Sequence, residues 1–398
     1  MTFILSPRPM TASAMVQRGL SLIEMMIGLT IGLMLTLGLF TLIANTSQSF
    51  KVQDDFSRMQ ENGATAFRYI GDSVRHAGFF GNTVVTDNIK VTSNSNVVDA
   101  TNPGCGSSPD NEPTANWAFG FTKPIIAFPD LTPGTVSATL PCIKSQNFYT
   151  LPIVAAPNPV LVTRGANGYR ICYALVAAPG PPICTNPNSL LSAQPDPANT
   201  VFVQSTPYDG WVFYGRDYSP ANGKKYLVNG APANDLEMFE YRAHIYYVRP
   251  CSRPAGGGAN CTGAADDNGN PIPTLVRQEL VGNAMVEVPL AEGIEWIDYR
   301  FGIDKDAGGK SDGVADRFVA NPAAGDWENV VSVKVTILVR SPGLNLAYDD
   351  SPKQYDLNGD GKTRIFRCTA QPPPSCSYKR KVFSQSFQVR NLAQRKGA

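Results

Sequence analysis

Residues 17–29 read QRGLSLIEMMIGL, a basic residue and a glycine followed by an apolar run that contains one acid, Glu24. From Met25 to Ala44 the run carries no charge, and the next charged residue is Lys51. At a helical rise of about 1.5 Å, about 20 residues cross a bilayer core of about 30 Å. The sequence therefore predicts a membrane-spanning helix with a carboxylate near its start, which is a costly place for a charge.

A secretory signal is the main alternative for this segment. The apolar region of such a signal spans about 7–15 residues and ends in a small-residue cleavage site. The run here is longer, and no A-x-A pattern closes it. Arg8 and Arg18 precede the run, so the positive-inside rule places the N-terminus in the cytoplasm and exports the chain from about residue 45 onward. We expect a retained helix with an exported head.

The helical pattern continues beyond the apolar run. Apolar and small residues recur at spacings of three and four, which places them on one helical face: Val52, Phe56, Met59, Gly63, Phe67, Ile70, Val74 and Ala77. Arg75 and His76 fall in the last turn, and Gly78 follows as a helix-ending glycine. We predict one helix from about Leu20 to Ala77, about 87 Å long, whose second half packs on a globular head.

Composition limits the class of the exported part. The formal net charge is +1, which argues against a nucleic-acid binder, because such a protein carries a basic excess. The chain holds 35 Gly and 32 Pro, and only 17% of its residues are charged. These values indicate a head rich in β-structure and in long irregular connections.

The cysteines predict disulfides. The even number of cysteines, 8, contains no C-x-x-C pair, and two histidines supply a zinc site poorly. In an exported head, nearest-neighbour pairing would close four Gly/Pro-rich loops. The expected pairs are Cys105 with Cys142, Cys172 with Cys184, Cys251 with Cys261, and Cys368 with Cys376. Free buried thiols are the alternative.

Gly19 followed by Leu20-Ser21-Leu22-Ile23-Glu24 resembles the processing signal of type IV pilins and pseudopilins. In that family a prepilin peptidase cuts after the glycine and methylates the new N-terminus. The resemblance implies a leader over residues 1–19, cleavage between Gly19 and Leu20, and N-methylation of Leu20. Leu20 stands where the family often has Phe, and Met15 is an alternative translation start that would shorten the leader.

The physics of Glu24 fits this resemblance. Cleavage after Gly19 would create an α-amino group at Leu20, one helical turn from Glu24. Within one helix that amine neutralises the carboxylate. Between two helices staggered by one turn, Glu24 of one subunit pairs with the amine of its neighbour and sets the axial register of an assembly. Both pairings stay open, and the alternative to both is an acid at the membrane interface that reaches the lipid headgroups.

The predicted fold class is α+β, with the long helix packed on one antiparallel sheet. Alternating strands are expected at 237–250, 274–281, 294–303, 329–341 and 381–392. The expected division is a transmembrane half (20–44) and an amphipathic half (45–77) of the helix, a loop-rich β insertion (78–235) and a C-terminal sheet region (236–398). Within the insertion, VLVTRG (160–165) and YRICYALV (169–176) are short β-branched pieces.

Three later blocks extend the resemblance. LAEGIEWIDYRFGIDKD (290–306), DWENVVSVKVTILVRSPG (326–343) and KRKVFSQSFQVRNL (379–392) look like the PilW group of minor pilins, relatives of the J-type pseudopilins. The family likeness does not reach residues of about 90–235.

Two loops rich in acids and glycine are candidate calcium sites. DLNGDGKT (356–363) places Asp356, Asn358 and Asp360 at positions 1, 3 and 5 of a calcium loop, but position 12 is Arg367 instead of Glu. A tight solvated turn is the alternative. The second loop, 304–316, offers Asp304, Asp306, Asp312 and Asp316. We expect no other cofactor.

The sequence contains one motif that is typical of hydrolases, but the residues that should accompany it are absent. Residues 309–313 match G-x-S-x-G, but the fold that uses it needs a histidine after the serine, and the last histidine, His244, precedes it. We therefore expect no enzyme. His76 is predicted to be a cation at the helix end. The cluster KRK (379–381) is predicted to be a solvated strand edge.

The resemblance implies a minor pilin that primes type IV pilus assembly or sits at the pilus tip. Its partners would be other minor pilins, the major pilin, a tip adhesin, the prepilin peptidase and the inner-membrane assembly platform, with no nucleic acid. It would span the inner membrane with a periplasmic head before joining the pilus. The alternatives are a J-type pseudopilin of a type II secretion tip complex and a membrane-anchored periplasmic binding protein.

Overall fold

The computed structural model describes residues 21–81, 83, 86–91, 105, 119–151, 158–173, 200–205, 207–214, 227–228, 231–232, 237–281, 284–305, 312–346, 348–359, 361, 364–368 and 376–392. The chain forms two compact units, Met1–Asp54 and Asp55–Ala398. The fold is α+β, as predicted, with one long helix and two main sheets.

The long helix α1 spans Leu22–His76, within two residues of the predicted bounds. Gly78 follows with φ +75°, a left-handed conformation that glycine adopts at no steric cost, as expected of a residue that ends a helix. The buried positions of α1 all lie in the second unit and recur at helical spacing: Met59, Gly63, Ala66, Phe67, Ile70, Gly71, Ser73 and Val74.

The larger sheet has eight strands, and its central strands are β3 and β8. Its members are β1 (Ile89–Val91), β2 (Ile125–Phe128), β3 (Val160–Tyr173), β4 (Val201–Ser205), β5 (Gly210–Tyr214), β8 (Glu237–Arg249), β9 (Thr274–Val281) and β10 (Ala284–Glu292). The order is β1-β5-β4-β8-β3-β2, with β9 pairing β8 and β10. Its pairings are antiparallel except for β1 with β5.

The second sheet has four antiparallel strands in the order β12-β11-β13-β16. They are β11 (Ile294–Ile303), β12 (Arg317–Val319), β13 (Val330–Arg340) and β16 (Arg380–Gln388). Two small ribbons are formed by β6 (Leu227–Val228) with β7 (Ala231–Pro232) and by β14 (Tyr355–Asp356) with β15 (Ile365–Phe366). The described short helices are α2 (Val136–Thr139), η1 (Thr86–Asn88), η3 (Ser145–Asn147), η6 (Ala255–Gly257), η7 (Asp266–Gly269) and η8 (Trp327–Asn329).

The prediction of a single sheet was wrong. The expected strands 237–250 and 274–281 are β8 and β9 of the eight-stranded sheet, whereas the three later ones are β11, β13 and β16 of the four-stranded sheet. Alternation along a strand says which side chains are buried and does not say which strands pair.

The two pieces expected in the loop-rich insertion also differ from the prediction. VLVTRG and the first residues of YRICYALV are one strand, β3, which pairs with β8 from Leu161↔Tyr246 to Tyr173↔Glu237. Val160 and Leu161 are fully buried. The described part of the segment between the helix and residue 235 therefore supplies core to the main sheet.

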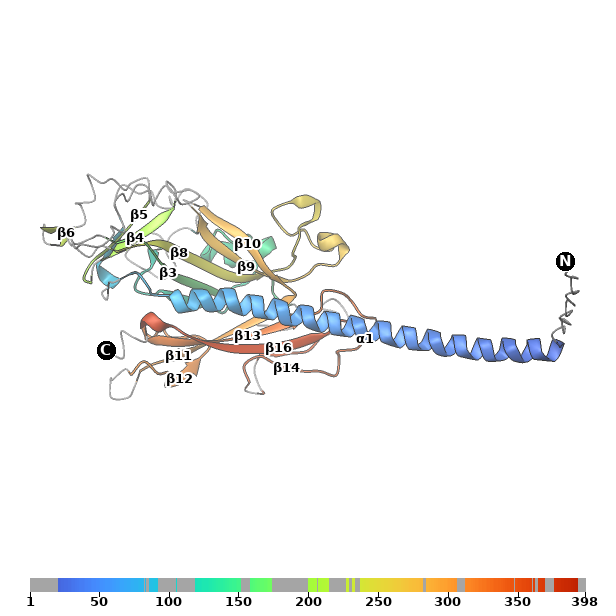
Figure 1. The fold of residues 1–398 in the computed structure, drawn as a ribbon. Coiled ribbons are helices and arrows are strands. Elements are labelled where there is room, and N and C mark those ends of the chain that lie inside the picture. Colours follow the sequence, from blue (N-terminus) through green and yellow to red (C-terminus); the bar gives the residue numbers. More distant parts are fainter. Residues whose placement is uncertain are drawn as a thin grey trace, which may run out of the picture. The chain divides into compact units, whose positions relative to one another are not determined.

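The second half of α1 lies between the two sheets, with β3, β8 and β9 on one side and β11, β13 and β16 on the other (Figure 1). A Cβ atom added to Gly63 would lie 3.4 Å from the ring of Phe383 on β16. On the opposite side, Ser73 Oγ lies 2.6 Å from the hydroxyl of Tyr246 on β8. The hydroxyl of Tyr246 also donates to the carbonyl of Tyr69 at 3.1 Å. Two sides of the helix therefore meet the two sheets, one through apolar contact and the other through hydrogen bonds.

Lys379 and Arg380 of the KRK cluster are buried and Lys381 is half-buried, which contradicts the prediction of a solvated edge. Arg380 Nε lies 2.6 Å from Glu295 Oε2, and Arg380 Nη1 lies 3.2 Å from Asp350 Oδ2, with all three side chains fully buried. Lys379 Nζ lies 3.0 Å from Asp55 Oδ2 on α1. These charges join β11, β16 and the helix at one end of the head. Isolated charge runs are usually solvated, and only the tertiary contacts supply the opposite charges.

Three disulfides are present in the described residues: Cys105–Cys142, Cys251–Cys261 and Cys368–Cys376. They coincide with three of the nearest-neighbour pairs. The fourth pair lies outside the described residues, because Cys184 and the side chain of Cys172 are not among them.

Gly71 is the closest approach of α1 to the four-stranded sheet. A Cβ atom at this position would overlap the buried ring of Phe387 on β16, whereas a Cβ atom at Gly63 would make an ordinary contact. We expect Gly71→Ala to lower the free energy of unfolding by about 1–3 kcal/mol through overpacking.

The matched variant Gly63→Ala should be neutral or raise stability by up to about 1 kcal/mol, because alanine is the better helix former. Urea unfolding of the detergent-solubilised chain, followed by the fluorescence of the buried Trp296, measures both. Equal stability of the two variants would show that Phe387 moves aside freely.

Candidate functional site

The start of α1 holds Glu24 in a local hydrogen bond. The backbone N–H of Ser21 donates to Glu24 Oε2 at 3.0 Å, and the backbone N–H of Met25 donates to the Ser21 carbonyl at 3.1 Å. Ser21 is thus the N-cap residue and Glu24 the third helical residue, the acid position of a capping box. An acid in the first turn also interacts favourably with the helix dipole.

This capping role was missed from the sequence, although its signal is printed there. Ser21-Leu22-Ile23-Glu24 is an S-x-x-E pattern just before an apolar run, which is the usual sequence signature of a helix start. Gly19 and Leu20 lie outside the described residues.

The first half of α1 has the properties of a membrane span. Its most apolar 18-residue window has a mean hydropathy of 2.2, and none of that window is buried. The large apolar side chains from Leu22 to Ile43 are all more than half exposed. One helix of this length and composition could cross a membrane.

The candidate calcium loop at 356–361 is organised by one carboxylate. Asp356 accepts backbone N–H groups from Asn358 at 3.1 Å, Gly359 at 2.8 Å and Gly361 at 2.7 Å. These bonds form a tight turn around the acid and occupy three of its acceptor positions. Asp360 lies outside the described residues, so the calcium prediction stays a prediction.

The second acidic loop also turns its carboxylates to the backbone. Asp304 is fully buried and accepts the N–H of Gly313 at 2.8 Å, while Asp316 accepts the N–H of Lys305 at 2.7 Å. Asp312 accepts the N–H of Val314 at 2.9 Å, and Asp306 lies outside the described residues. In the described part, these acids bind their own loop and do not converge on one point.

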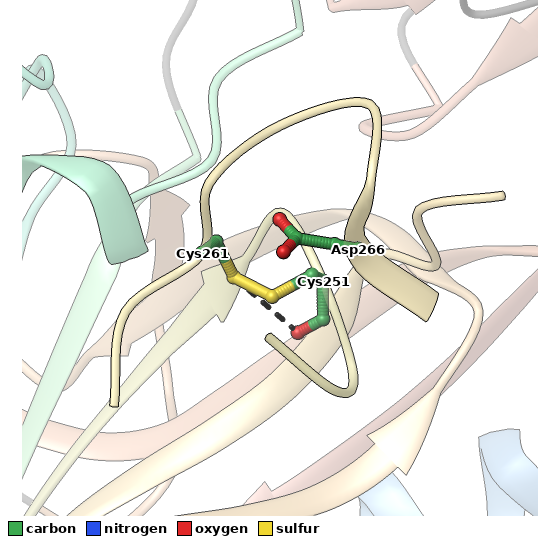
Figure 2. Close-up of side chains that lie close together, drawn as sticks. All are labelled: Cys251, Cys261 and Asp266. Carbon is green, nitrogen blue, oxygen red and sulfur yellow. Dashed lines mark hydrogen bonds between the residues drawn. A yellow bond between two sulfur atoms is a disulfide. The ribbon is translucent and has the colours of Figure 1, made fainter. Parts of the chain in front are cut away.

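Cys251, Cys261 and Asp266 form the one group of potential metal ligands found close together among the described residues. Figure 2 shows the two sulfur atoms bonded to each other beside the Asp266 carboxylate. A disulfide offers no thiolate to a metal. The carboxylate accepts N–H groups from Ala255 at 2.7 Å, Thr262 at 2.7 Å and Gly263 at 2.8 Å. This group therefore holds the loop 251–267 in shape.

The two histidines of the chain line a small cavity where α1 ends against β3 and β8. Its lining comprises Asp72, Ser73, His76, Thr163, Arg164, Gly165, Ala166, Asn167, Arg242 and His244. Ser73 Oγ lies within hydrogen-bond distance of His244 Nδ1, at 2.8 Å. Ser73 also bonds Tyr246, and in the described structure no carboxylate hydrogen-bonds His244 to complete a catalytic set.

The two histidines have opposite pKa shifts. Burial lowers the pKa of His244 well below its usual value, and the nearby Arg277 and Arg242 lower it further. The hydrogen bond to Asp72 raises the pKa of His76, which lies in the last turn of α1. His244 is therefore neutral in the folded head, whereas His76 favours its charged form.

His244 should make the head less stable in acid. A neutral buried histidine contributes stability that is complete above its unfolded pKa of about 6.5 and is lost as the pH falls through and below that value, by about 1.4 kcal/mol per pH unit. His76 acts in the opposite sense, because its contribution is complete at low pH and is lost as the pH rises through its raised pKa. We expect urea stability to fall from pH 7.5 to pH 5.5 most steeply in His76→Gln.

The matched variant His244→Gln should show a flatter pH dependence than the unmodified chain, since glutamine does not titrate and can still bond Ser73. A double variant, which contains no histidine, gives the baseline from the carboxylates. An unchanged slope in His244→Gln would mean that protons reach His244 without unfolding the head.

The later strands of the chain match a known protein family. Residues 261–391 match the family model PilW, described as Type IV Pilus-assembly protein W. The match runs from the end of the Cys251–Cys261 loop through β16 and includes the four-stranded sheet. No curated protein and no solved structure matches the chain.

Proposed function

We infer that the chain is a PilW-like pilus protein that takes part in type IV pilus assembly; the family match over residues 261–391 supports this inference, and that family is not an enzymatic one. We propose, from this premise, that the chain is a minor pilin. It would be made in the inner membrane as a prepilin, be cut after Gly19, and join other minor pilins in a complex that primes the pilus or sits at its tip. The observation that carries this proposal is the match of residues 261–391 on a chain whose N-terminal helix begins with an exposed apolar half.

The geometry at Ser21 supports a role for Glu24 after cleavage. The Ser21 nitrogen is already 3.0 Å from Glu24 Oε2, and the new amine would belong to Leu20, the preceding residue. A carboxylate has about four acceptor positions, so the capping bond leaves room for a charged partner. In a free subunit the amine of the same chain is the nearer partner. In an assembly the amine of a neighbouring subunit would compete for the same oxygen atoms.

In this proposal the head binds the other subunits of the pilus assembly. By this proposal its contacts are with other minor pilins, the major pilin and a tip adhesin, while the helix start meets the prepilin peptidase and the assembly platform. We propose no catalytic role for any residue.

Processing is tested on the mature N-terminus. We expect mass spectrometry of the chain purified from pilus-forming cells to find an N-methylated Leu20 as the first residue, and an intact leader when the prepilin peptidase is deleted. An intact leader in cells that contain the peptidase would contradict the proposal and favour a membrane-anchored protein outside the pilus.

Two substitutions separate the capping role of Glu24 from its charge. Glu24→Gln keeps an acceptor for the Ser21 N–H, whereas Glu24→Ala removes it, and both remove the charge. We expect both variants to be processed and both to show at least about tenfold less incorporation into sheared pili, because the lost interaction is a charge-assisted bond. Normal incorporation of Glu24→Gln, measured by immunoblotting, would mean that capping alone is sufficient.

A further inference from the structure

Strand β16 ends the four-stranded sheet and leaves one edge open. Its inner edge pairs with β13 in an unbroken register from Ser332↔Gln388 to Arg340↔Arg380. Its outer edge pairs with no described strand. The central residues Ser384, Gln385 and Ser386 are exposed.

The other described strands at the ends of the two main sheets are short or irregular. β1 and β12 have three residues each and β2 has four. β10 has nine residues, but it contains Pro289, where its register with β9 shifts. Such features keep a sheet from pairing with another chain. β16 has nine residues, with no proline, glycine or register shift, and its charges lie only at Arg380 and Lys381.

A groove of about 470 Å³ lies along this strand, between β16 and α1. Its lining comprises Gln60, Ala64, Phe67, Arg68 and Arg75 of α1 and Phe383, Gln385 and Phe387 of β16. The β16 members alternate along the strand, so they share one face of the sheet, the face that meets α1. The floor is therefore largely aromatic and the helix side carries two arginines with no acid.

The arginines of this groove are placed to meet a ligand. Arg68 and Arg75 are both exposed, and the Arg75 guanidinium carbon lies 5.3 Å from the centre of the Phe387 ring. A strand that paired with β16 would extend the pleated sheet. Every second side chain of that strand would then point toward the groove arginines and the aromatic rings of β16.

We propose that β16 accepts an extended segment of another polypeptide as a fifth strand, with apolar and acidic side chains on the face turned to α1. Backbone hydrogen bonds along the open edge would provide affinity, and the aromatic floor with its arginines would select the segment. This inference rests on the proposed function in one respect, that the donor is another subunit of the pilus assembly.

Charge argues against a second copy of this chain as the donor. A pairing of two β16 strands would bring two copies of the same basic groove, each lined by Arg68 and Arg75, side by side in one sheet. Like charges that are brought close together repel, so an acidic donor is the better match.

The open edge can be tested with the purified full chain in detergent and a synthetic peptide. The probe is a fluorescent TETVTVTET, whose glutamates and valines share one face of a strand. Its controls are TKTVTVTKT, in which the charges are reversed, and TETVPVTET, in which proline removes a central N–H donor. We expect measurable binding of the acidic probe only, with slower hydrogen exchange in β16 when it is bound.

Charge reversal on the protein completes the test. Arg68→Glu combined with Arg75→Glu should weaken binding of the acidic peptide TETVTVTET by at least about tenfold and strengthen binding of the basic peptide TKTVTVTKT. Arg253 is an exposed arginine on the Cys251–Cys261 loop. Arg253→Glu is therefore the matched control, and it should leave the binding of both peptides unchanged.

Three results would overturn the proposal: no binding of TETVTVTET at millimolar concentration, equal binding of all three peptides, or binding without added protection in β16. The last result would indicate docking on the helix side of the groove. Because no pilus is needed for these measurements, they can fail while Leu20 is still found methylated, and the reverse also holds.

The donor in cells is tested by a photo-crosslinking residue placed in turn at positions 383 to 387. A paired strand should give crosslinks to one subunit in a pattern of period two, whereas a docked helix would give a period near 3.6 and contradict the proposal.

Discussion

The burial of the second half of α1 between two sheets is the contact on which the head depends. From Met59 to Val74 the helix packs against the inner face of each sheet. Without the helix, both inner faces would be exposed to water. The two sides differ in chemistry. Toward β16 the contact is apolar and so close that only glycine fits at residue 71. Toward β8 it is polar, through Ser73, His244 and Tyr246.

This asymmetry explains where the unusual ionisable groups lie. His244 is held neutral because the polar side of the helix contact is also dehydrated and flanked by arginines. At the other end of the helix segment, Lys379 reaches Asp55, and Arg380 neutralises Glu295 and Asp350 in the interior. A buried ion pair is weak evidence for added stability, but removal of one member leaves a charge without compensation. These pairs therefore tie the start of β16 to one position relative to β11 and the helix.

The helix start shows how one residue can have a local and a wider role. Glu24 accepts the backbone N–H of Ser21, as the acid of a capping box does, which is sufficient reason for an acid at that position in any helix. The apolar half that follows has no cover within its own unit. Its exposed surface calls for a bilayer or for other helices, and in either surrounding a carboxylate that retains acceptor positions is a strong attractor for a positive charge.

Much of the fold was predictable because it depends on local periodicity. The bounds of α1 follow from spacings of three and four and from Gly78, and the five later strands follow from alternation. The S-x-x-E pattern at Ser21 was equally readable, although it was overlooked. The PilW likeness seen in three sequence blocks agrees with the family match over residues 261–391.

The sequence alone thus determined the long two-part helix, the α+β class and the likeness to a pilus-assembly family, since each depends on residues close together along the chain. Only the tertiary structure decided that the strands divide between two sheets, that Lys379 and Arg380 are buried, and that β16 is the long open edge. Those features depend on which distant residues become neighbours: Glu295 and Asp350 reach Arg380 across separations of 85 and 30 residues. No local pattern of charge or hydropathy carries that information, because pairing is chosen by the packing of the whole head.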